Sequence, residues 1–278
     1  NVISDEIPTL ATDAFKDLPQ EFVIYVAPGK EDAYRKAWPQ YADHIQGIRE
    51  KKESEIKVVE VAIPGTLGDK LGFTVNMDDK DDVGRISGDF TAIKALKVIG
   101  KINGKDIAVL RMLGGREEED ADEVVFARMN YLDLYDATIC TDDDNICFNR
   151  DGVNDYVKND NEVPEHMFWR LDMLETVILP KNATKIADNA FYDCLNLQTI
   201  VVGDATTEIG NDAFGKCKNL KHIVFLCNEK PDLDSDAFTD PISDQPHQVE
   251  KMYVASSIYK QYVEDTEYTS HAKEIKHE

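Results

Sequence analysis

The stretch that decides the fold occurs twice: residues 186–200 read IADNAFYDCLNLQTI, and residues 209–223 read IGNDAFGKCKNLKHI. The second copy begins 23 residues after the first and keeps its apolar positions, while the polar positions vary. A weaker copy precedes both at the same spacing. Its apolar positions are Phe168, Leu171, Leu174 and Val177. Three copies at one spacing predict a solenoid, in which each unit buries its apolar face against its neighbours.

Each copy is expected to contain one short strand and one short helical turn. Residues 174–179, 197–202 and 220–225 share the pattern Leu-x-x-apolar-x-apolar, and its last two apolar positions have the period of two that is typical of a short strand with one buried face. The helical turns are expected to begin at the capping pairs Asp188-Asn189 and Asn211-Asp212 and to carry the Ala-Phe dipeptides.

The same strand pattern continues upstream, at residues 93–98 and 129–137. Between these strands, Gly100 and Asn103-Gly104 predict a turn. An amphipathic pattern follows the turn as far as residue 113, and Asp106 is expected to cap this helix.

Composition excludes several classes of function. With 278 residues and 42% hydrophobic content, the chain can bury a large core. The 31 Lys and Arg residues against 54 Asp and Glu give a net charge of −23, so we expect no nucleic-acid partner. No apolar stretch approaches the roughly 18 residues of a membrane span. The start at Asn1, without Met or a signal peptide, is interpreted as a processed form or an excised fragment.

The cysteines favour buried thiols over bonds. Cys194 and Cys217 occupy the same place in successive copies, where a small apolar side chain packs inward. Stacked copies would also bring this pair within reach of oxidation, so a disulfide stays open. Cys140 and Cys147 flank an acidic loop and form a second candidate pair. Neither pair has zinc-site spacing.

A second echo relates the two ends of the chain. Residues 8–15 read PTLATDAF and residues 231–238 read PDLDSDAF. The run Tyr25-Val26-Ala27 and then Tyr34–Trp38 matches Tyr253-Val254-Ala255 and then Tyr259–Tyr262. Both copies predict a last strand followed by a short aromatic helix that covers the open sheet edge.

These patterns predict three segments. Residues 1–50 are expected to be a remnant or terminal capping repeat, the tail of an earlier array, and the charged run at residues 49–55 is the expected linker. Residues 51–160 are expected to form an N-terminal module of longer repeats. Residues 161–278 are expected to hold the 23-residue repeats and a C-terminal cap.

The pattern Ile-x-x-x-Ala-Phe-x-x-Cys-x-x-Leu-x-x-Ile at 186–200 and 209–223 resembles the BspA-like leucine-rich repeat family of bacterial surface proteins. Residues 62–67, 96–107 and 132–137 are similar to an N-terminal module common in gut-associated members. The resemblance implies an α/β fold, a right-handed, β-rich leucine-rich repeat solenoid. Its short strands would form a parallel sheet, with short helices and loops on the convex side. It also implies a secreted or outer-surface protein that binds other proteins, with a lipid anchor upstream in many members and host matrix attachment in some.

The candidate binding residues lie between the inward apolar positions of the strands and so face the concave surface. They are Thr176, Ile178, Thr199, Val201, His222, Val224 and Tyr253. The register extends this set to Lys97 and Asp133. The Ile178, Val201 and Val224 stripe is expected to be apolar and exposed, which indicates a partner surface. The alternative is that β-branched residues suit strands and pack beside one another.

No other constellation indicates chemistry. The acidic runs at 78–82, 117–123 and 142–144 do not match a calcium loop, so solvated loops are favoured. The six histidines are scattered, without a nucleophile arrangement. Residues 65–70 lack the Gly-Lys-Ser/Thr ending of a phosphate loop, so a turn is expected. We therefore expect no catalytic residue, no metal site and no cofactor.

The function expected from these observations is a non-enzymatic cell-surface protein-interaction module. It would present its concave sheet to a host or matrix protein, as an adhesin does. The alternative is a structural spacer or assembly component of a larger surface protein. A sequence of this kind does not name the partner.

Overall fold

The computed structural model describes residues 24–26, 31–47, 56–76, 85–87, 89–115, 127–141, 146–150, 153–240, 245–246 and 248–277. The first copy of the end echo (residues 8–15), the charged linker (49–55) and the acidic runs at 78–82, 117–123 and 142–144 lie outside these residues. What the sequence predicts for them stays a prediction.

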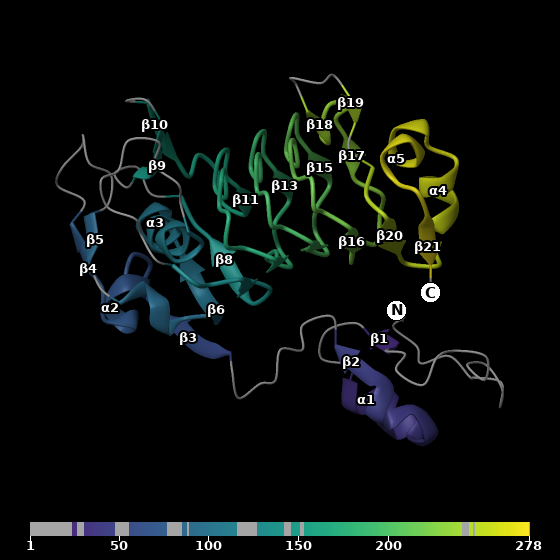
Figure 1. Cartoon of the computed structure of the whole chain (residues 1–278), viewed down its shortest axis with the longest axis horizontal. Coiled ribbons are helices and arrows are strands. Elements are labelled where there is room, and N and C mark those ends of the chain that lie inside the picture. Colours follow the sequence, from purple (N-terminus) through teal and green to yellow (C-terminus); the bar gives the residue numbers. More distant parts are fainter. Residues whose placement is uncertain are drawn as a thin grey trace.

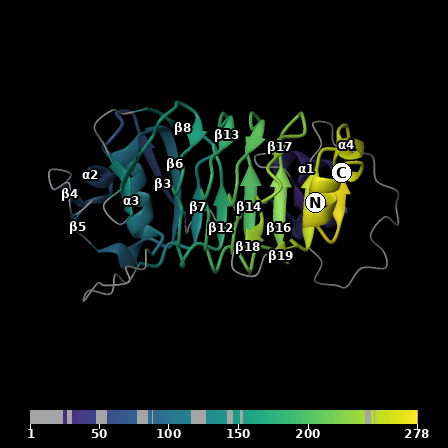
Figure 2. The same ribbon diagram turned by 90° about the horizontal axis from the view of Figure 1, so that it is seen from above.

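A nine-stranded parallel sheet runs along one face of the array (Figures 1 and 2). Its order is β21-β20-β16-β14-β12-β7-β6-β3, and β8 pairs with the end of β6. The strands are β3 (Lys57–Val61), β6 (Ala95–Ile102), β7 (Tyr131–Asp133), β8 (Ala137–Ile139), β12 (Thr176–Ile178), β14 (Thr199–Val202), β16 (His222–Phe225), β20 (Lys251–Val254) and β21 (Ile275–His277). Val177 pairs with Ile200 and Ile200 with Ile223, so the strands predicted in the three copies are confirmed.

The inward side chains of successive coils form continuous columns in the core. Phe168 stacks on Phe191 with ring centroids 4.8 Å apart, Phe191 on Phe214 at 5.5 Å, and Phe214 on Phe238 at 5.1 Å. All four rings are fully buried. One coil therefore completes the interior of the next, as an α/β repeat fold requires.

The cysteine column follows the same rule. Cys194 and Cys217 are buried free thiols, and their Sγ atoms donate to the carbonyls of Phe168 (2.8 Å) and Phe191 (2.9 Å). Burial raises the pKa of the Cys217 thiol well above its ordinary value, which keeps it protonated and unreactive. Cys140 is also a free thiol, so the pairing with Cys147 does not form.

A second, smaller parallel sheet joins the coils on another side. It consists of β11 (Glu162–Val163), β13 (Lys185–Ile186), β15 (Glu208–Ile209) and β17 (Asp232–Leu233). Each strand has two residues, and Ile186 pairs with Ile209. The sequence did not indicate this sheet, because a two-residue strand is too short to show alternation.

The prediction of short helical turns within the repeats is wrong. Residues 188–193 and 211–216 form consecutive turns, in which Asn189 (φ 56°), Asp193 (φ 60°), Asp212 (φ 49°) and Lys216 (φ 57°) adopt left-handed backbone conformations. These conformations end a helix after each turn and direct backbone N–H groups toward the next coil. The amides of Phe168 and Phe191 donate to the carbonyls of Ala190 (2.7 Å) and Ala213 (2.8 Å). Asp188 likewise accepts from the backbone amide of Asn211 in the next coil instead of capping a helix.

The coils upstream are longer and carry helices, as the sequence predicts. The elements are α2 (Leu67–Leu71), β4 (Thr74–Asn76), β5 (Arg85–Ser87), the 3-10 helix η3 (Phe90–Ala92), α3 (Gly104–Leu113), β9 (Ile146–Arg150) and β10 (Val153–Tyr156). β4 and β5 pair antiparallel, as do β9 and β10. The turn expected at Gly100 is wrong. Gly100 lies inside β6 with φ +98°, where a Cβ would stand 2.3 Å from the Val61 carbonyl oxygen.

A buried carboxylate joins α2 to α3. Asn103 is the N-cap of α3, and Asp106 completes a capping box by accepting from the Asn103 amide. Asp106 also accepts from the amides of Gly65 (2.6 Å) and Leu67 (2.8 Å). The turn expected at residues 65–70 is confirmed only at its start, since residues 67–70 belong to α2. The amides of Gly65 and Leu67 already donate to a carboxylate of the chain itself.

Arg111 of α3 closes the first coil of the 23-residue array. It is 2% exposed, and its guanidinium donates to the carbonyls of His166 (2.7 Å), Met167 (2.9 Å) and Trp169 (3.2 Å). Met167 and Trp169 occupy the positions that Ala190 and Tyr192 occupy 23 residues later, in the next coil. The carbonyls of Ala190 and Tyr192 accept hydrogen bonds from backbone amides of the coil before them. The guanidinium thus supplies the donors that one more coil would have supplied.

Two short units complete the chain. The C-terminal unit contains β20, α4 (Tyr259–Val263), α5 (Thr266–His271) and β21, and it follows the hairpin of β18 (Thr239–Asp240) and β19 (Gln245–Pro246). The N-terminal unit contains β1 (Ile24–Val26), α1 (Glu31–Ala37), the 3-10 helix η1 (Pro39–His44) and β2 (Ile45–Gly47). It has a separate core of Ile24, Val26, Tyr34, Trp38 and Ile45.

Candidate binding face

The outer face of the nine-stranded sheet brings the predicted site residues into two columns. The first column contains Tyr131, Thr176, Thr199, His222 and Lys251, each paired with the next. The second contains Lys97, Asp133, Ile178, Val201, Val224 and Tyr253. This register is the one the sequence predicts. Figure 2 shows the strands β7, β12, β14 and β16, which carry most of these residues, side by side.

The apolar stripe on this face is not exposed, and the expectation that it would be is wrong. Ile178 and Val201 are 0% exposed and Val224 is 1% exposed. Each lies between its equivalents in the neighbouring coils. The partly buried Ile56, Tyr135, Leu226 and Tyr253 also pack against this cluster. The three side chains therefore form a floor under the face, as β-branched neighbours on a sheet commonly do.

The accessible part of the face is polar and aromatic. Thr176, Thr199, His222 and Tyr253 are all partly exposed. The rings of His222 and Tyr253 lie on adjacent strands with centroids 6.0 Å apart. A partner would meet hydroxyl, imidazole and phenol groups on a rigid sheet, and such groups combine hydrogen bonding with apolar contact.

A charged cluster marks the upstream part of the face. Lys97 and Lys181 donate to Asp136 at 2.7 and 3.2 Å, and Lys97 lies 3.8 Å from the buried Asp133. Burial acts to raise the pKa of Asp136, but the hydrogen bonds from both lysines outweigh it and hold that pKa below its ordinary value. The sequence placed Lys97 and Asp133 here but missed Asp136 and Lys181, because both lie just beyond the strand ends.

Comparison with protein families identifies the repeats. Residues 147–244 match the model of the BspA type leucine rich repeat region in six copies. This stretch is a BspA-type leucine-rich repeat region. The match begins inside β9, ahead of residue 161, where the sequence predicts the start of the 23-residue repeats. Repeats of this type generally occur in surface-associated proteins and mediate protein–protein interaction. No curated protein matches the chain.

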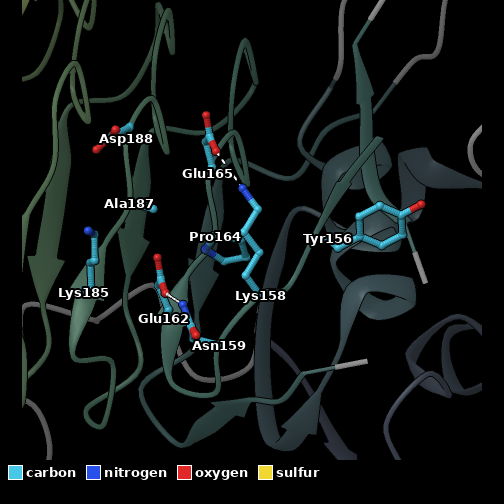
Figure 3. Close-up of a pocket in the computed structure, with 9 residues that line it drawn as sticks. All are labelled: Tyr156, Lys158, Asn159, Glu162, Pro164, Glu165, Lys185, Ala187 and Asp188. Atoms are coloured by element: carbon cyan, nitrogen blue, oxygen red, sulfur yellow. Dashed lines mark hydrogen bonds and ion pairs between the residues drawn. The ribbon is translucent and has the colours of Figure 1, made fainter. Parts of the chain in front are cut away.

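The BspA-type region also carries a small pocket of about 140 Å³ beside β11 and β13 (Figure 3). Its polar side chains are already paired: Lys158 with Glu165, Asn159 with Glu162, and Lys185 with Glu208. A ligand here would have to break these pairs. The pocket is therefore a weaker candidate than the sheet face.

The histidines in the described part of the chain do not converge on one site. His222 lies on the sheet face, His166 is buried beside the first turn, and His271 is buried against Phe238. No group of three or more His, Cys, Asp or Glu side chains within the described ranges could hold a metal ion. Among the same residues, no helix is long and apolar enough to cross a membrane.

The position of His222 predicts a pH dependence. Burial lowers the pKa of His222; Glu250 opposes this shift, and Lys251 and Lys221 add to it. The unfolded chain therefore takes up a proton at a higher pH than the folded chain does. Stability is fully present above the ordinary histidine pKa of about 6.5 and falls as the pH drops through the lower folded value.

We expect His222→Gln to lose less stability on acidification than the unmodified chain. Thermal unfolding of both proteins, followed from about pH 7.5 to about pH 5, checks this expectation. Parallel curves for the two proteins over that range would show that His222 does not contribute.

Proposed function

We propose that the chain is a non-enzymatic protein-binding module of a surface or secreted protein. Its coils would form a right-handed solenoid that holds a partner against the outer face of the main sheet. The observation that carries this proposal is the in-register column of Thr176, Thr199 and His222, with Tyr253 beside it. The BspA-type region supports it, because repeats of that type mediate protein–protein interaction.

The buried floor makes this face suitable for binding. Ile178, Val201 and Val224 are held by their neighbours in the stack, so the residues beside them are presented with little freedom to lose. Tyr253 offers a large partly exposed aromatic side chain, a residue type enriched at binding hot spots. The partner is an extracellular or matrix protein in this proposal, and binding to it would be adhesin-like.

A substitution in the middle of the column tests the proposal. Thr199→Arg places a long charged side chain among Thr176, His222 and the buried floor, and it should weaken binding by about tenfold or more, equivalent to about 1.4 kcal/mol. Binding of the full chain to a panel of purified extracellular-matrix proteins would be measured at physiological salt.

Thr184→Arg is the matched control, because Thr184 is exposed and lies next to β13. It should leave binding unchanged, and both variants should keep the unfolding temperature of the parent. Equal binding by the parent and Thr199→Arg to every protein that the parent captures would reject this face as the site.

A spacer role is the second candidate, supported by the continuous phenylalanine column and the closed first coil. A stack of this kind transmits rigidity along its length. If the parent chain binds no protein of the panel, the spacer role becomes the better account.

A further inference from the structure

The two end units of the chain have the same architecture. In the N-terminal unit, β1 and β2 are parallel and are joined by α1 and η1; in the C-terminal unit, β20 and β21 are parallel and are joined by α4 and α5. Ile24 pairs with Ile45, as Met252 pairs with Ile275. The likeness between the two segments therefore extends from sequence to topology and register.

Each unit also contains one edge-to-face aromatic pair. The rings of Tyr34 and Trp38 lie 4.8 Å apart at 71°, and those of Tyr262 and Tyr268 lie 4.6 Å apart at 73°. The structure thus equates Tyr34 with Tyr262, whereas the sequence matched it to Tyr259. The spacing agrees with the structure, because Tyr34 follows Tyr25 by nine residues, as Tyr262 follows Tyr253, whereas Tyr259 follows Tyr253 by six.

The aromatic pair of the C-terminal unit covers a side chain of the last coil. Phe225 at the end of β16 packs against Tyr262 at 5.3 Å and Tyr268 at 5.7 Å, and β20 pairs with β16 along its other edge. This unit therefore covers the side chains and the open strand edge of the last coil. An uncovered edge and an exposed phenylalanine would invite aggregation.

We propose that residues 24–47 are a second cap of the same kind, and that β1 receives the terminal strand of a leucine-rich coil preceding it in the polypeptide. Among the described residues, β1 pairs only with β2. In the C-terminal unit, the covered coil comes directly before the cap in the sequence. The same order here makes the chain a link between two arrays.

The first strand of the array that follows, β3, cannot fill this edge by the parallel pairing seen in the C-terminal unit. A crossover between two parallel strands is almost always right-handed. Both β1–β2 and β3–β6 are joined by such crossovers, so β2 lies beside β1 on the same side on which β6 lies beside β3. The open edges of β1 and β3 then have the same hand, so they could form a parallel pair only with their buried faces reversed. Only residues 48–56 separate β2 from β3, fewer than the dozen or so of a parallel crossover, so β2 does not continue into that sheet.

A cap exchange within the full chain tests the proposal. Residues 252–277 are replaced by a second copy of residues 24–47, so that Ile24 faces Ile223 and Phe225 meets Tyr34 and Trp38. The graft is expected to unfold in one transition within about 5 °C of the parent. A control with a Gly-Ser segment of equal length in the same place should aggregate or lose that transition.

Two results would overturn the proposal. A graft that behaves like the Gly-Ser control would show that residues 24–47 do not recognise a coil. A concentration-dependent dimer of the unmodified chain in sedimentation, abolished by Tyr25→Pro, would place a second copy on β1 instead. Either result leaves the binding role of the main sheet unaffected, since Thr199→Arg tests that role separately.

Discussion

The Phe191→Ala variant is expected to lose about 3–5 kcal/mol of unfolding free energy, the usual range for a large-to-small change in a closed core. Phe191 is fully buried between Phe168 and Phe214, so the cavity would lie in the middle of the column. Because each coil is stabilised by its neighbours, a weak coil in the middle also separates the coils on either side.

Urea unfolding of the full chain measures this loss. Leu195→Ala is the matched control, because Leu195 belongs to the same coil but is 40% exposed, and it should cost well under about 1 kcal/mol. If both variants lose the same amount, the phenylalanine column does not couple the coils. A second transition in the Phe191→Ala curve would show that the array has separated into two cooperative units.

The Arg111→Met variant is expected to lose about 3 kcal/mol, because three backbone carbonyls would lose a charged donor in the interior. Methionine keeps much of the volume of the side chain, so the loss reports on the hydrogen bonds. Arg111→Lys should recover only part of the stability, since an ammonium group cannot reproduce the planar fork of a guanidinium.

Arg170→Met is the matched control for this prediction. Arg170 lies in the same turn region and is partly exposed; it stacks on Trp169 at 5.1 Å and lies 3.5 Å from Asp193. Ion pairs that water reaches contribute about 1 kcal/mol or less. Thermal and urea unfolding of all variants gives the comparison, and a loss below about 1 kcal/mol for Arg111→Met would contradict its closing role.

The repeat period predicted the parts of the fold that depend on one coil at a time. Alternation around Val177, Ile200 and Ile223 gave the strands, and the constant spacing gave their register. It also gave the phenylalanine column and the two columns of the sheet face. The left-handed residues of the turns were missed, because Asn189 and Asp212 suit a helix start as well as a left-handed turn.

The register of the candidate site residues was predicted from the sequence, but their exposure was not. Whether Ile178 or Val201 is accessible depends on the side chains of neighbouring strands and on Tyr135, Leu226 and Tyr253 beside them. No pattern within one repeat contains that information. Asp136 and Lys181 joined the face for the same reason, since they meet across 45 residues.

The sequence by itself determined that coils stack in register with a shared apolar interior, because alternation and period are properties of each segment alone. Only the tertiary structure decided how the stack is closed and what its surface offers. Arg111 reaches carbonyls at least 55 residues away, and the stripe on the sheet is buried by its neighbours. Such contacts join parts of the chain with no common pattern, so they exist only once the coils are in place.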